Sequence, residues 1–269
     1  MITSARRIAL VTLLAAVAFV SPARVEAQEN GDSDFRQFGA WLDDASAPVR
    51  GEGQTTIAVG HWRTAAMNQT DAPMLAGSLG VSDRLQVSGS LPFYRTSLSG
   101  STFSGVDSIY LGAKYNLIDP TLSLSEIGLS IGSVVEVLSA GTPGGRVHFV
   151  VPVSFELRRA PYRWYASAGY FSRGAVFCGG AMEWTTPHRV TLTGSLTQSY
   201  SKQANASLDA LGVGRQRFDV SAGAAYPLGT QAAAYANIGR SLSSVAEGGS
   251  RLALSGGISF WFRTPLATP

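Results

Sequence analysis

The chain has 269 residues, and its 21 Lys and Arg against 18 Asp and Glu give a formal net charge of +3. Only 14% of the residues are charged, whereas ordinary soluble domains carry roughly 25%, and no basic patch or arginine-rich tract indicates a nucleic-acid partner. The single cysteine, Cys178, excludes an intrachain disulfide, so backbone pairing and packing must hold the fold together.

The first 27 residues have the features of a secretory signal peptide. Arg6 and Arg7 precede an apolar run over residues 8–20, and residues 25–27 form a small-residue cleavage site. The apolar run is shorter than the roughly 17 to 25 residues that a membrane-spanning helix needs. We therefore expect residues 1–27 to be removed and the mature chain to be exported, with nearly balanced charge.

Residues 28–52 are polar, apart from an apolar patch at residues 38–42 that is followed by Asp43 and Asp44. This composition predicts a periplasmic N-terminal lead-in in which the two aspartates form a turn or a cap. No group of His, Cys and Asp has the spacing of metal ligands. We expect neither a metal site nor a cofactor.

From residue 53 to residue 263, apolar and polar residues alternate with a period of two, which is typical of strands with one apolar face. For example, Val147 and Phe149 alternate with Arg146 and His148. We predict twelve strands, at residues 53–62, 73–81, 84–94, 106–118, 125–138, 146–158, 162–171, 175–185, 188–199, 215–227, 230–240 and 250–262.

The connections between these strands alternate in length. After even-numbered strands they are tight turns, such as residues 82–83 and 159–161, whereas most of those after odd-numbered strands are longer and polar, such as residues 63–72 and 95–105. An even strand number, short turns at one end and longer loops at the other are typical of bacterial outer-membrane barrels.

The predicted fold is therefore all-β: a transmembrane antiparallel up-and-down β-barrel of about 12 strands over residues 53–263, with a short tail at residues 264–269. A barrel can cross a bilayer because closure leaves no unpaired backbone edge. Aromatic residues near both strand ends resemble interfacial girdles: Tyr115, Tyr162, Trp164, Trp184, Tyr226, Phe260 and Phe262 at the periplasmic end, and Trp62, Phe93, Tyr94, Tyr170 and Phe171 at the other.

If the apolar faces contact lipid, the polar faces line the lumen. Their charges allow two interpretations: a mildly cationic constriction that favours anionic or polar solutes, or ion pairs that cross the lumen and fix the register. Pairing is favoured because isolated buried charge is costly. The candidate lumen-lining residues are Arg84, Lys114, Glu126, Glu136, Arg146, His148, Glu156, Arg158, Glu183, Arg189, Arg217, Asp219 and Arg251.

Two stretches resemble a known family of outer-membrane barrels. Residues 80–85, Gly-Val-Ser-Asp-Arg-Leu, enter a strand that ends in Leu-Pro-Phe at residues 91–93. A second motif, Gly-Val-Asp at residues 105–107, precedes Ala-Lys-Tyr at residues 113–115. This combination is similar to the family named for the MetA pathway of phenol degradation. The resemblance implies an outer-membrane location and the passage of small, hydrophobic molecules, and it implies no catalytic residue.

An enzyme that hydrolyses lipid would need a Ser/His constellation. The chain has three histidines: His148 on an inward face, His188 in a turn and His61 near the aqueous rim. None has a serine beside it in a nucleophile motif, so we expect no catalytic activity.

The favoured function is a passive channel or uptake component for small molecules, hydrophobic or anionic, in the outer membrane of a Gram-negative bacterium. Two alternatives remain: a structural or surface barrel plugged by its own side chains or by residues 28–52, and a lipid-hydrolysing barrel. The expected partners are outer-membrane lipids, an unidentified solute and the barrel-assembly machinery. Phe260 and Phe262 resemble the terminal aromatic signal for insertion, although residues 263–269 follow them.

Overall fold

The computed structural model describes residues 42–63, 67–98, 100–106, 108–120, 126–137, 147–172, 174–201, 216–243 and 251–266. The signal peptide expected over residues 1–27 lies outside them. No helix within these ranges is long and apolar enough to cross a membrane. The described residues form thirteen strands: β1 (Glu52–Arg63), β2 (Met67–Ser82), β3 (Leu85–Leu98), β4 (Ser101–Val106), β5 (Ile109–Ile118), β6 (Ile127–Val137), β7 (Val147–Arg159), β8 (Tyr162–Phe171), β9 (Ala175–Thr185), β10 (Thr191–Ser201), β11 (Gln216–Pro227), β12 (Ala232–Ser241) and β13 (Leu252–Arg263).

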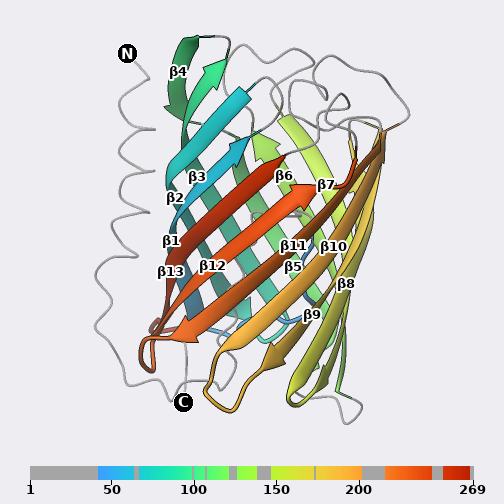
Figure 1. The fold of residues 1–269 in the computed structure, drawn as a ribbon. Helices are drawn as coiled ribbons and strands as arrows, with labels where there is room; N and C mark the ends of the chain where they lie inside the picture. Colours follow the sequence, from blue (N-terminus) through green and yellow to red (C-terminus); the bar gives the residue numbers. More distant parts are fainter. Residues whose placement is uncertain are drawn as a thin grey trace, which may run out of the picture.

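The sheet closes on itself into an antiparallel barrel (Figure 1). β1 pairs with β13 along its whole length, from Glu52 opposite Arg263 to Arg63 opposite Leu252. β5 pairs with the first half of β3, residues 85–90, and β4 pairs with the second half, residues 93–98. Twelve strands therefore form the closed wall and β4 is an additional short strand, which confirms the predicted barrel.

β2, β3 and β4 extend beyond the strands that the alternation predicts. Loops were expected at residues 63–72 and 95–105, but strands run through much of both ranges. These extensions are rich in polar residues, so no alternation of apolar and polar side chains marks them. Backbone pairing joins them, and side-chain hydrogen bonds add to it: Thr96 Oγ1 donates to Gln69 Oε1 over 2.7 Å.

β7 shows how the two faces of the wall differ. Its odd-numbered residues from Val147 to Phe155 are apolar and exposed, whereas His148, Ser154 and Glu156 point inward and are buried. Across the described strands many large apolar side chains are exposed and many buried side chains are polar. This is the reverse of a soluble protein, in which an apolar surface of this extent would be unfavourable.

Exposed aromatic side chains lie toward both ends of the wall. Phe171 was expected among them, but it faces inward and packs with Val150, Ala175 and Phe177. Its neighbour Tyr170 takes the outward position. The exposed aromatic residues include Tyr115, Tyr162, Trp164, Trp184, Tyr226 and Phe260 at the end where β1 begins, and Phe93, Tyr170 and Tyr200 toward the other end.

The seam between β1 and β13 is fixed by side-chain contacts as well as by backbone pairing. The hydroxyls of Thr56 and Ser259 lie 2.8 Å apart on the inner face. A Cβ at Gly53 would lie 2.5 Å from the ring of Phe262, so the seam leaves room at this position for glycine alone. The final strand therefore closes the barrel by pairing with the first one.

Candidate functional site

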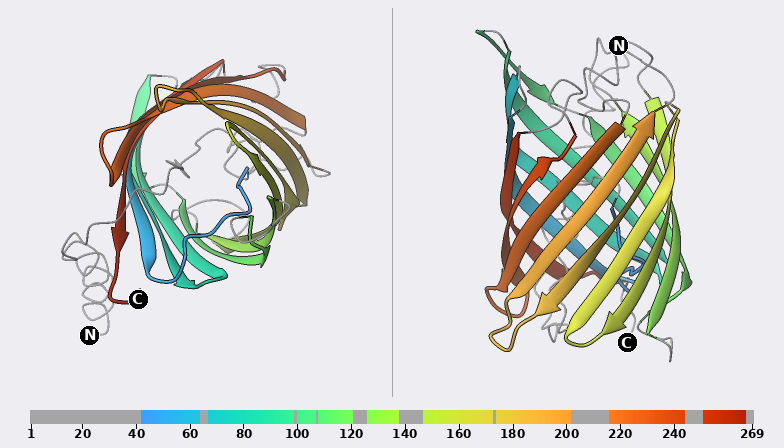
Figure 2. Two further views of the ribbon diagram at one scale, coloured as in Figure 1. Left: turned by 90° about the horizontal axis from the view of Figure 1, so that it is seen from below. Right: turned by 45° about the vertical axis from the view of Figure 1, so that its right-hand side comes forward.

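The chain before β1 enters the barrel. Figure 2 (left) shows this segment, in blue, lying inside the ring of strands. Leu42, Asp44 and Ala45 are each at most 5% exposed. We call residues 42–46 the lumenal strap. The sequence placed residues 28–52 in a periplasmic lead-in. Of these residues, the strap lies inside the barrel, where the alternative of a barrel plugged by residues 28–52 would put it, because its polar groups find partners on the inner wall that no local pattern could reveal.

The strap leaves the barrel at the rim beside β2. The amide of Gly51 donates to the carbonyl of Gly80 over 2.8 Å, and the amide of Glu52 donates to the carbonyl of Val49 over 3.0 Å. A Cβ at Gly80 would lie only 2.2 Å from the Val49 oxygen. The close approach of the chain to β2 therefore depends on glycine at this position.

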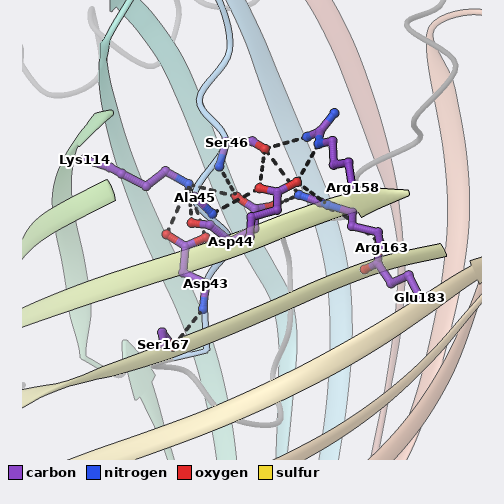
Figure 3. Close-up of polar contacts among 10 residues, drawn as sticks. Asp43, Asp44, Ala45, Ser46, Lys114, Arg158, Arg163, Ser167 and Glu183 are labelled. Carbon is purple, nitrogen blue, oxygen red and sulfur yellow. Dashed lines mark hydrogen bonds and ion pairs between the residues drawn. The ribbon is translucent and has the colours of Figure 1, made fainter. Parts of the chain in front are cut away.

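Lys114, on β5, holds both aspartates of the strap (Figure 3). Its Nζ lies 3.2 Å from Asp43 Oδ2 and 3.2 Å from Asp44 Oδ1, and it donates to the Asp44 carbonyl over 3.4 Å. Asp44 also forms a turn, since its Oδ1 accepts from the amide of Ser46 over 3.0 Å. One buried ammonium group thus binds two adjacent carboxylates.

Arg163, on β8, links the strap to the wall. Its Nη2 donates to Asp44 Oδ2, its Nε lies 2.7 Å from Glu156 Oε1 and its Nη1 lies 3.3 Å from Glu183 Oε2. The guanidinium group also lies over the ring of Tyr165, 5.4 Å from its centroid. A planar guanidinium with several donors suits this role, because it can bind several carboxylates at once.

Glu156, on β7, is the most deeply buried member of the group and is 0% exposed. Its Oε2 accepts from the amide of Ala45 over 3.2 Å and from the hydroxyl of Ser46, and its Oε1 accepts from Arg158 and Arg163. These donors replace the water that burial removes from the carboxylate. Charged groups inside a protein are tolerated in this way, by pairing and hydrogen bonding.

The strap supplies half of the carboxylates in this cluster. Three cationic side chains, Lys114, Arg158 and Arg163, face Glu156 and Glu183 on the wall together with Asp43 and Asp44 on the strap. The wall groups alone therefore have a net charge of +1, and the two aspartates of the strap change the net charge of the cluster to −1. The strap is held mainly by charge and hydrogen bonds, with Leu42 adding a small apolar contact to Tyr165 and Ala181.

Eight of the candidate lumen-lining residues lie on the inner side of the wall, in two groups. Lys114, Glu156, Arg158 and Glu183 belong to the strap cluster. The others lie toward the opposite end: Tyr110 donates to Glu136 over 3.0 Å, and Arg217 Nε lies 2.6 Å from Asp219 Oδ2. The eight are Lys114, Glu136, His148, Glu156, Arg158, Glu183, Arg217 and Asp219.

Four other candidates lie beyond the ends of the strands and are exposed. The predicted strands run past the points where the chain turns. Outside a strand, the alternation of apolar and polar residues does not determine which way a side chain points. Arg146 lies outside the described residues. The four exposed residues are Arg84, Glu126, Arg189 and Arg251; Glu126 and Arg189 also have positive φ angles, of 57° and 64°.

Arg163, Asp43 and Asp44 are the residues of the cluster that sequence reasoning missed. A signal for Arg163 was present, since it alternates with the exposed Tyr162 and Trp164 on β8. The two aspartates had no such signal, because they lie outside any strand and their partners lie 70 or more residues away along the chain.

Two described histidines lie near a hydroxyl group. His61 Nδ1 lies 3.0 Å from Thr70 Oγ1 in an exposed pair that joins β1 and β2. His148 Nδ1 lies 3.5 Å from Ser172 Oγ, beyond the roughly 2.6–3.2 Å of a nucleophile–base contact. That hydroxyl also accepts from the amide of Phe149 over 3.0 Å. Within the described residues, no three His, Cys, Asp or Glu side chains are placed to hold a metal ion.

Comparison with known proteins finds similarity at the level of the fold. No protein-family model matches the chain, and no curated protein does. The COG4313 outer membrane channel from Pseudomonas putida F1 is 14% identical with a TM-score of 0.60, covering 83% of this chain and 98% of the channel. The NanC porin is 9% identical with a TM-score of 0.55, covering 77% and 98%.

Two further structures extend the comparison. The KdgM porin is 10% identical with a TM-score of 0.52, and the alignment covers 76% of this chain and 98% of the porin. LpxR from Salmonella typhimurium is 10% identical with a TM-score of 0.50, covering 77% and 99%. At these identities the likeness concerns the backbone alone. The chain has the closed antiparallel barrel fold of outer-membrane proteins, among them a channel and two porins.

Proposed function

We propose that the protein is a passive channel for small molecules in the outer membrane. The observation that carries the proposal is the inverted distribution of side chains, with apolar residues on the outside of a closed barrel and charged and polar residues inside. Only a closed barrel or a helix satisfies its backbone hydrogen bonds in hydrocarbon, and a polar interior is typical of channel-forming barrels. The likeness of the fold to a channel and two porins supports the same function.

Polar or anionic solutes fit the described interior better than hydrophobic ones. Polar and charged side chains occupy most of the buried positions that we describe, and the strap cluster places three cationic side chains among four carboxylates, two of which belong to the strap. The inward apolar side chains form small clusters, such as Val150 with Phe171 and Phe177. The hydrophobic solutes that the family resemblance implies therefore have less support from the interior.

Single-channel recording of the purified protein in planar bilayers tests this function. Stepwise conductance is expected, and silence in several salts would contradict it. Two neighbouring positions on β7 give a matched pair. Ser154 points inward and Val153 outward, so Ser154→Trp should lower the conductance and Val153→Trp should leave it unchanged. A slower gel migration after boiling would show that both variants had folded.

The strap favours one competing function, that of a surface barrel whose lumen is plugged and which transports nothing. It lies inside the barrel toward the end where β1 begins, and four strands contribute side chains to its binding site. The same recordings separate the two functions. A plugged barrel would show no conductance, either in its native form or after removal of the negative charges on the strap.

Location and partners belong to the same proposal. The exposed apolar side chains and the aromatic residues at both ends suit a bilayer, so outer-membrane lipid is the expected surrounding. The exposed Phe260 near the end of β13 is suited to recognition by the barrel-assembly machinery. Separation of the inner and outer membranes on a density gradient tests the location; recovery of the folded protein in the inner-membrane fraction would contradict it.

A further inference from the structure

We propose that the inner wall carries a binding site for small dicarboxylates, formed by Lys114 and Arg163 with Arg158 beside them, and that Asp43 and Asp44 occupy this site as an internal competitor. The proposal deepens the proposed function, because it names the class of solute that the channel would bind. The strap is then more than a plug: its two carboxylates show where and how the carboxylates of a solute would bind.

The site is built into the wall. Lys114 comes from β5, Arg158 from β7 and Arg163 from β8, and the side chains of Lys114 and Arg163 are 8% and 9% exposed. Glu156 and Glu183 hold Arg163 from two sides, at 2.7 Å and 3.3 Å. The guanidinium is thus kept in position by the wall through two of its nitrogens, while the third, Nη2, points at the strap.

The strap binds this site as a dicarboxylate would. Its two carboxylates are adjacent, both bind the ammonium group of Lys114, and one of them also binds Arg163 (Figure 3). One carboxylate of a solute can accept from Arg163 Nη2, as Asp44 does, and a second carboxylate a few bonds away reaches the neighbouring ammonium group of Lys114. Small linear dicarboxylates have this spacing of charges.

The charges explain why a dianion, rather than an uncharged solute, can take the place of the strap. The wall cations exceed the wall carboxylates by one, and both ion pairs of Lys114 described above are made with the strap. A strap that left without replacement would leave buried positive charge without these partners, which is costly. A dicarboxylate removes that cost, because it brings back the two negative charges that leave with the strap.

The apolar contact of the strap is small enough to permit this exchange. Among the described contacts, Leu42 with Tyr165 and Ala181 is the apolar cluster that includes a strap residue. Besides the ion pairs, the other anchors are hydrogen bonds. The Asp43 amide donates to Ser167 Oγ over 3.3 Å and the Ala45 amide to Glu156 over 3.2 Å, and the Ser46 hydroxyl donates to Glu156 and accepts from Arg158 and Arg163. Water can replace these bonds once the strap leaves.

Calorimetric titration with succinate tests the proposal on the folded, detergent-solubilised full-length mature protein. The double variant Asp43→Asn/Asp44→Asn removes the charges of the competitor. It should bind succinate at least about tenfold more tightly than the native protein, because a tethered competitor acts at an effective concentration in the millimolar range. Adding Lys114→Met to this variant should abolish the binding. Asp83→Asn, in the exposed turn between β2 and β3, is the matched charge control and should leave the affinity unchanged.

Hydrogen–deuterium exchange of the native protein gives a second readout that needs no variant. Saturating succinate should raise exchange at the amides of Asp43 and Ala45, whereas acetate, sulfate and the uncharged succinamide should not. Equal succinate affinity of the native protein and the double variant, unchanged exchange, or equal effects of sulfate and succinate would each overturn the proposal. Binding in detergent does not require conduction, so a silent bilayer would contradict the channel and leave this result standing.

Discussion

Glu156 is the residue on which the strap cluster depends most. It accepts four hydrogen bonds, two from arginines on the wall and two from the strap. Loss of one partner of a buried ion pair is more damaging than loss of both, because the remaining charge stays buried without compensation. The carboxylate therefore contributes both to the stability of the wall and to the seating of the strap.

Glu156→Ala should lower the free energy of unfolding by about 3–5 kcal/mol, the range for breaking a buried ion pair. Glu156→Gln should cost less, because its amide oxygen can still accept from Ala45. Urea unfolding in lipid vesicles, followed by tryptophan fluorescence, measures both. The control is Glu52→Gln, which removes a 2.7 Å ion pair with the exposed Arg263 and should cost no more than about 1 kcal/mol. Equal losses at the two positions would show that the cluster does not stabilise the barrel.

At the level of elements, the strap is held by a close approach as well as by charge. Pro48 and Val49 cross β2 at Gly80, where a Cβ would lie 2.4 Å and 2.2 Å from their carbonyl oxygens. A backbone oxygen cannot move away without shifting the segment that carries it. The position of the strap therefore depends on one glycine in a neighbouring strand.

Gly80→Ala should loosen the strap. Overpacking costs about 1–3 kcal/mol, so the amide of Ala45 should exchange its hydrogen about tenfold faster than in the native protein. Gly194→Ala on β10 is the control, because a Cβ there meets no atom within 4 Å. Mass spectrometry of the peptide that spans residues 42–46 provides the measurement. Equal exchange in both variants would mean that the passage over β2 does not hold the strap.

The strands could be predicted from the sequence because their pattern is local, whereas the position of the strap depends on residues far away along the chain. The period of two predicted which side of β7 would be buried, because neighbouring residues on a strand point in opposite directions. It also predicted the strand number and the short turns at one end. It missed the outer part of β2, where polar residues lie on both faces. It could not place Asp43 and Asp44, whose partners are brought near only when the barrel closes.

For the whole molecule, the apolar outer surface implies a lipid surrounding. Charge on that surface should be costly in proportion to its depth in the bilayer. β7 offers a depth series, since Val153 lies midway along its length and Val147 at its outer end, and both are exposed. The same substitution at the two positions therefore changes depth and little else.

Val153→Arg should lower the free energy of unfolding by about 2–4 kcal/mol in lipid vesicles, and Val147→Arg by about 0–1 kcal/mol. Urea titration in vesicles gives both values. Repeating the titration in detergent micelles should reduce the difference, because a micelle deforms around a charge more easily than a bilayer does. Equal costs at both depths in vesicles would be inconsistent with a bilayer centred on β7.

The path of the strap also affects the mechanics of the barrel. It joins the rim at β2 and ends among side chains of β5, β7, β8 and β9, on another part of the circumference (Figure 2, left). In geometric terms it is a chord of the barrel's cross-section. A hydrogen-bonded sheet resists stretching along its circumference but can flatten into an ellipse. The strap opposes flattening at its own level in the barrel. The shape of the cross-section there is therefore set by the strap across the lumen as well as by the number of strands in the wall.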